Sequence, residues 1–195
     1  MKISIPIIEV NQDNNTFYLG KILVKDLLKI ATVKVRGDYK DTKLEGYFQE
    51  VKNQVKKTQE ISEKDFNFSL DNLPVDTGIQ RGGESERLKK IGSYLTQKNT
   101  SFPNSIIINL LRKDKEKDLE SSIKIHKEKI EIDDTSVVAN IIDGQHRLAG
   151  FNYVQNEARK KYLLENFELI VTILIEASIP EQAELFAIIN GTQKA

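Results

Sequence analysis

Apolar and polar positions alternate through the N-terminal part of the chain, and this period of two predicts β-strands at residues 2–10 and 16–24. The segment between them, residues 11–15, is Asn-Gln-Asp-Asn-Asn, so the two strands are expected to form a β-hairpin. A short helix is expected directly afterwards, carried by Leu27, Leu28, Ile30 and Ala31. The sheet is therefore expected to begin at the N-terminal end.

Apolar runs alternate with helical spacing in the second half of the chain. Continuous apolar runs predict buried strands at residues 105–111, 137–142 and 167–175. Apolar residues three and four positions apart predict helices at residues 84–98, 144–162 and 179–189. Ser178 and Glu181 form a capping box at the start of the last helix. The alternation predicts a single α/β domain over residues 1–195, with a central mixed sheet flanked by helices.

Two polar segments interrupt this order. Residues 44–58 have helical spacing but precede a polar stretch, and we interpret residues 41–74 as an insertion. Residues 112–134 are dominated by Lys, Asp and Glu, and are expected to form a solvated excursion that contains short strands. Residues 78–83 are rich in glycine and are interpreted as a loop.

Composition and charge limit the classes of function. A chain of 195 residues, 39% hydrophobic, can bury a core without help from a metal or disulfide. The absence of cysteine excludes disulfides, thiolate catalysis and cysteine metal sites. Lys+Arg and Asp+Glu both number 29, whereas a dedicated non-specific nucleic-acid binder is normally basic. The longest apolar run is too short for a membrane span, so a cytoplasmic protein without membrane contact is expected.

The most informative motif is the turn at residues 143–147, Asp-Gly-Gln-His-Arg, hereafter the motif turn. A turn from a buried strand into a helix gathers backbone N–H groups and is suited to anions. Gly144 would admit a phosphate to the backbone, Arg147 offers a fork of donors, and His146 exchanges protons near neutral pH. Asp143 has three open roles: helix cap, Mg²⁺ ligand, or orienting group for a water. An ordinary helix start with solvent-facing Gln145, His146 and Arg147 is the alternative.

Other polar residues are secondary candidates. Gln80 and Arg81 lie in the glycine-rich loop and could contact an anion, although an ordinary connector has the same composition. A glycine helix stop explains Asn190 but leaves Gln193 unexplained. His126 lies in the charged excursion without a second histidine at ligand spacing, so it is interpreted as solvated.

Residues 141–150, Ile-Ile-Asp-Gly-Gln-His-Arg-Leu-Ala-Gly, resemble the signature of the DGQHR-domain proteins. This group contains DndB of DNA phosphorothioate modification systems. Three further segments resemble the family's other motifs in the same order, at residues 78–81, 102–105 and 184–194. The resemblance therefore covers nearly the whole chain, although family members usually continue beyond the segment at residues 189–194.

The resemblance implies a fold similar to the ParB/sulfiredoxin-like superfamily and a nucleotide phosphate at the motif turn. It implies that Gly144, Gln145, His146 and Arg147 contact phosphate and that Gln80 and Arg81 approach the same cleft. Asp143 and His146 would be the catalytic residues if ATP or another NTP is hydrolysed with Mg²⁺. The expected partner is DNA or a DNA-modification or defence complex. The alternatives are a non-enzymatic DNA-binding transcriptional regulator and an interaction module with a degenerate ligand site.

Overall fold

The computed structural model describes residues 2–13, 15–32 and 80–178, together with Glu181, Gln182, Leu185 and Ile189. In the first helix after residue 79, side chains are described from Glu86 onward. The predicted insertion at residues 41–74 and the helix at 44–58 lie outside the described residues. Met1–Val33 and Gly83–Ala177 form one compact unit, and the sheet and site below belong to it.

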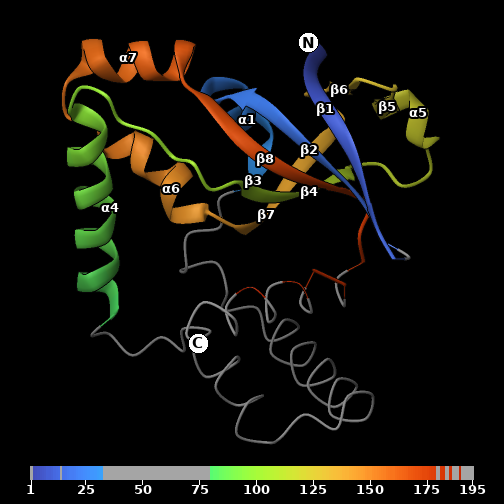
Figure 1. Cartoon of the computed structure of the whole chain (residues 1–195), viewed down its shortest axis with the longest axis horizontal. Helices are drawn as coiled ribbons and strands as arrows, with labels where there is room; N and C mark the ends of the chain where they lie inside the picture. Colours follow the sequence, from blue (N-terminus) through green and yellow to red (C-terminus); the bar gives the residue numbers. More distant parts are fainter. Residues whose placement is uncertain are drawn as a thin grey trace, which may run out of the picture. The chain divides into compact units, whose positions relative to one another are not determined.

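A mixed sheet of eight strands forms the framework, in the order β3-β7-β4-β8-β2-β1-β6-β5 (Figure 1). The β3–β7 and β4–β8 pairs are parallel, and the other five pairs are antiparallel. This arrangement confirms the predicted α/β class with a central mixed sheet. The strands are β1 (Lys2–Gln12), β2 (Asn15–Leu23), β3 (Ala31–Thr32), β4 (Ile106–Arg112), β5 (Ile123–Ile125), β6 (Lys129–Asp133), β7 (Val137–Asp143) and β8 (Glu168–Ile175).

Helices complete the core that the strands begin. They are α1 (Val24–Ile30), α4 (Gln80–Thr96), α5 (Leu119–Ser122), α6 (Gln145–Gly150), the 3₁₀ helix η2 (Phe151–Tyr153) and α7 (Glu157–Asn166). Their buried apolar residues join alternate strand residues in one cluster, which includes Leu27, Leu95, Leu148, Phe151 and Leu163 from the helices and Ile106, Ile108 and Leu110 from β4. We call the sheet face that carries these β4 residues the inner face, and the opposite one the outer face.

Two features predicted from the local sequence are confirmed: the N-terminal hairpin and the capping box at Ser178. β1 and β2 pair antiparallel from Ile7 with Gly20 to Gln12 with Asn15. The capping box is confirmed, because the Ser178 N–H donates to Glu181 Oε2 at 2.6 Å. The return bond from the Glu181 N–H to Ser178 Oγ measures 3.5 Å.

The predicted single helix at residues 144–162 is wrong. The chain instead forms α6, the η2 turn and α7, and the side chain of Asn156 caps α7 by accepting the Arg159 N–H at 2.8 Å. The backbone leaves helical geometry at Val154, which is extended at φ −70° and ψ 115°. Packing is tight just before this point, since a Cβ on Gly150 would lie 2.2 Å from Ile91 Cγ2. A Cβ on Gly92 would likewise lie 2.4 Å from the Tyr153 carbonyl oxygen. The two glycines let α4 pass close to the end of α6 and to η2.

Two smaller expectations also need correction. The loop predicted at residues 78–83 is wrong for its second part, because α4 already begins at Gln80. Glycines lower helix propensity by about 1 kcal/mol each, a local cost that tertiary context can override. Within the charged excursion, the expected strands are present as β5 and β6, but the short helix α5 was not predicted.

Candidate functional site

Gly144 gives the motif turn its shape. β7 ends at Asp143, and Gly144 follows with φ 91° and ψ 9°, which is the left-handed conformation that disfavours side chains. A Cβ at this position would also lie 3.0 Å from both Ile106 Cγ1 and Arg147 Nη2. Backbone conformation and packing therefore both require glycine here.

A β-bulge just before the turn changes the direction of Asp143. Ile141 pairs with Ile108 and Asp143 pairs with Ile107, so Ile142 has no partner on β4. One extra residue reverses the alternation of side chains along a strand. Asp143 therefore shares the outer face with Ile107, and the bulge places a carboxylate at the end of a central strand.

Arg147 fastens the turn to the segment that precedes β4. Its Nη1 donates to the Asn104 carbonyl oxygen at 2.6 Å, and its Nη2 donates to the Ser105 carbonyl oxygen at 3.0 Å. Nη2 also donates to Asp143 Oδ2 at 3.1 Å. The proposed capping role of Asp143 is wrong, because Gly144 is the N-cap residue and no side chain caps α6. Asp143 instead accepts a hydrogen bond from the Arg147 guanidinium, which connects the motif turn to Asn104 and Ser105.

The segment before β4 is itself fixed from several sides. Arg159 Nε donates to the Leu95 carbonyl oxygen at 3.1 Å, and its Nη2 donates to that of Gln97 at 2.9 Å. Thr172 Oγ1 on β8 donates to Ser105 Oγ at 2.9 Å. Ser105, whose carbonyl oxygen accepts from Arg147, is therefore also hydrogen-bonded to β8.

The other residues of the predicted site are placed only in part. Gln145 and His146 open α6 and are partly buried. Gln80 and Arg81 lie in the first turn of α4, and their side chains are outside the described residues, as are Asn190 and Gln193. The expectation that Gln80 and Arg81 approach the motif turn therefore stays a prediction. Across the described ranges, no group of three or more His, Asp or Glu side chains could hold a metal ion.

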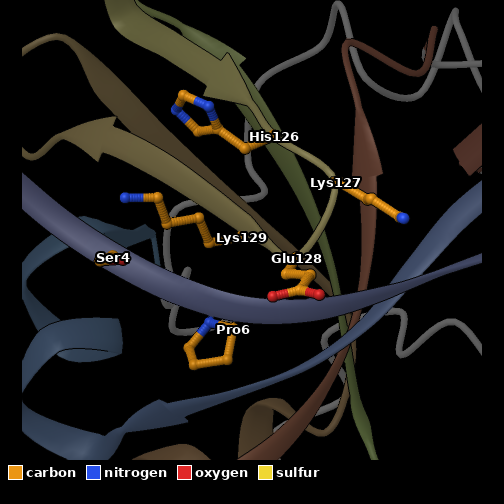
Figure 2. Close-up of a pocket in the computed structure, with 6 residues that line it drawn as sticks. All are labelled: Ser4, Pro6, His126, Lys127, Glu128 and Lys129. Carbon is orange, nitrogen blue, oxygen red and sulfur yellow. The ribbon is translucent and has the colours of Figure 1, made fainter.

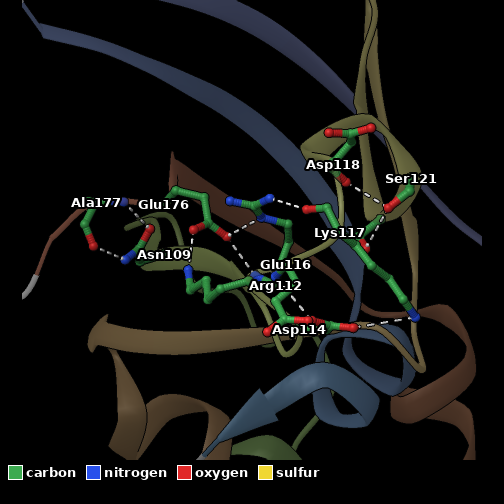
Figure 3. A network of polar contacts seen from close by, with 11 residues as sticks. Asn109, Arg112, Asp114, Glu116, Lys117, Asp118, Ser121, Glu176 and Ala177 are labelled. Carbon is green, nitrogen blue, oxygen red and sulfur yellow. Dashed lines mark hydrogen bonds and ion pairs between the residues drawn. The ribbon is translucent and has the colours of Figure 1, made fainter.

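A polar network at the end of β8 was missed from the sequence (Figure 3). Asn109 is fully buried, donates to the Ala177 carbonyl oxygen at 2.8 Å and accepts the Ala177 N–H at 3.0 Å. Glu176, at φ 53°, accepts the Arg112 N–H at 2.6 Å and a hydrogen bond from Lys115. Burial raises the pKa of Glu176, but these hydrogen bonds outweigh it and hold that pKa below its ordinary value. An asparagine within the apolar run of β4 was the available signal.

A shallow pocket of about 430 Å³ lies at the turn between β5 and β6 (Figure 2). Its lining comprises Ser4, Pro6, His126, Lys127, Glu128 and Lys129. The side chain of His126 is 46% exposed, which confirms that it is solvated. Lys129 donates to Glu131 Oε1 at 2.5 Å, so part of the local positive charge is already neutralised.

The fold and the motif turn define the class of protein: an α/β protein whose bulged central strand enters an Asp-Gly-Gln-His-Arg turn. The family model described as DndB, DNA-sulfur modification-associated, matches residues 55–195. The chain belongs to the DndB family, as its motifs suggested, and this membership implies involvement in DNA phosphorothioate modification. No curated protein and no solved structure matches the chain. None of the described helices is long and apolar enough to cross a membrane.

Proposed function

We propose that this chain binds a nucleoside triphosphate through its phosphates at the motif turn, and that this binding is its part in DNA sulfur modification. The observation that carries the proposal is the conformation of Gly144, left-handed at the end of β7 and directly followed by helical residues. Such a sequence of conformations turns successive backbone N–H groups toward one point and forms a concave anion site. A glycine there also lets a phosphate approach the backbone closely.

The side chains around the turn have separate roles in this proposal. Gln145 and His146 follow Gly144 directly and are the side chains that would contact phosphate. Among the described residues, Arg147 uses three of its five N–H donors on protein oxygens, so two remain for a ligand. In this proposal, Arg147 mainly positions the turn and also adds positive charge. Asp143 binds Arg147 through Oδ2, and Oδ1 is the oxygen that would face a phosphate-bound Mg²⁺.

The experiment uses the fact that the chain has two histidines. His146 belongs to the motif turn, whereas His126 lies between β5 and β6, at the other end of the strand order from β7. The imidazole NMR signals of the full chain are followed during titration with ATP, GTP, CTP, UTP or tripolyphosphate, each with and without Mg²⁺. A His126→Gln variant assigns the two signals.

A saturable shift of the His146 signal with a stationary His126 signal is the expected result. Unchanged signals with every phosphate compound would overturn the proposal, and equal shifts of both histidines would mean non-specific binding. A duplex DNA that shifts His146 where no nucleotide does would favour the DNA-binding regulator. Phosphate release measured on the same samples shows whether hydrolysis accompanies binding.

A further inference from the structure

A polar row crosses the outer face of the sheet beside the motif turn. Asn140 of β7 pairs with Thr32 of β3 on one side and with Asn109 of β4 on the other. Paired residues on neighbouring strands direct their side chains to the same face. Asparagine is depleted in strands, because it packs poorly on a pleated apolar surface. The presence of two paired asparagines, Asn109 and Asn140, inside the sheet therefore calls for an explanation.

The two asparagines differ in what their amides bind. Asn109 uses its amide nitrogen and oxygen on the backbone of Ala177, so its role in the fold is evident. Asn140 is partly buried, and its side chain makes no hydrogen bond in the part of the chain that the structure describes. A buried amide without partners lowers stability. Within the described residues, the Asn140 amide therefore has donors and an acceptor that are available to a ligand.

The bulge at Ile142 brings this amide into register with the motif turn. Because the extra residue reverses the alternation, Asn140 and Asp143 share the outer face although three positions separate them. Their partners on β4, Asn109 and Ile107, are two residues apart, so the two side chains are separated by about 7 Å along the strands, from a rise of about 3.3 Å per residue. A ligand with its phosphates at the motif turn can therefore extend along β7 toward Asn140.

We infer that the Asn140 carboxamide recognises the nucleobase of the nucleotide, an inference that rests on the proposed function. A carboxamide presents two donors and one acceptor in a plane, which matches the paired donor and acceptor of a base edge. Thr32 lies beside it and offers a hydroxyl to the same base. In this arrangement the motif turn binds the phosphates, and Asn140 selects the base of the bound nucleotide.

The test compares Asn140→Leu with the matched variant Asn109→Leu in the full chain. Calorimetric titrations with ATP, GTP, CTP, UTP and tripolyphosphate give affinities, and thermal unfolding gives Tm. Asn140→Leu should weaken the preferred nucleotide about tenfold, which is about 1.4 kcal/mol, and remove the difference between bases. Its tripolyphosphate affinity should stay at the wild-type value and its Tm should not fall. Asn109→Leu should lower Tm and keep the base preference.

Three results would overturn the inference: wild-type base preference in Asn140→Leu, an equal loss of tripolyphosphate binding, or a Tm loss as large as that of Asn109→Leu. If wild-type protein binds tripolyphosphate as tightly as every nucleotide, the inference fails and the phosphate site stands. If it binds none of these compounds, both fail. Asn140→Thr, which suits a strand and is shorter, gives the same comparison should the leucine variant not fold.

Discussion

Replacement of Arg147 by alanine tests whether this side chain holds the motif turn. The change removes hydrogen bonds to the carbonyl oxygens of Asn104 and Ser105 and to Asp143 Oδ2. The bond to Asn104 is exposed, so water can replace it in the variant, whereas the other two are partly buried. Each hydrogen bond to a charged group contributes about 1.5–3 kcal/mol, and the lower end of this range, applied to the two bonds that are only partly buried, predicts a loss of about 3 kcal/mol.

Thermal and urea unfolding of the full chain measure this loss. For a chain of this length, 1 kcal/mol corresponds to about 2–4 °C, so Arg147→Ala should melt about 6–12 °C below wild type. Arg87→Ala is the matched control, because Arg87 is exposed on α4 and makes no hydrogen bond or ion pair within the described residues. It should change stability by less than about 0.5 kcal/mol.

Arg147→Lys separates the positioning role from direct phosphate contact. Lysine keeps the charge but cannot reproduce the fork that reaches two carbonyl groups and a carboxylate. Positioning predicts that this variant is nearly as unstable as Arg147→Ala. The reasoning is refuted if Arg147→Ala melts with wild type, or if the lysine variant restores full stability.

Two further predictions concern the turn and the network at the end of β8. Gly144→Ala should lower stability by about 1–3 kcal/mol in urea unfolding, because alanine is strained at a positive φ and its Cβ meets Ile106 at 3.0 Å; a variant as stable as wild type would contradict this turn geometry. The hydrogen bonds that lower the pKa of Glu176 contribute stability above the ordinary value of 4.5, and this contribution is lost as pH falls through the lower folded value. Glu176→Gln should therefore destabilise the protein more at pH 7 than at pH 3, and equal losses in urea at both would show that the folded pKa is not lowered.

The sequence alone determined the features that depend on neighbours along the chain. Period-two alternation predicted the N-terminal hairpin, and continuous apolar runs predicted β4, β7 and β8 within a residue or two at each end. The capping box at Ser178 needed only residues within one helical turn. The motif turn likewise indicated the DndB family, because its five residues are consecutive in the sequence and can be read without knowledge of the fold.

Tertiary contacts decided how those pieces work together. The helix after the motif turn ends before the extended residue Val154, and Gly150 packs against Ile91 of another helix; the apolar periodicity of the sequence detects neither feature. The sequence does not show which acceptor the Arg147 guanidinium binds, because its donors suit a phosphate and a carbonyl group equally. Only the fold brings Arg147 and Ser105 together across 42 positions. The bulge at Ile142 depends on register with β4, yet it decides that Asp143 and Asn140 share a face. Asn109 and Asn140 look alike in sequence, but the Asn109 amide binds the backbone of Ala177, whereas the Asn140 amide has no hydrogen-bond partner among the described residues. Only the fold separates them, because hydrogen-bond partners are set by distance in space.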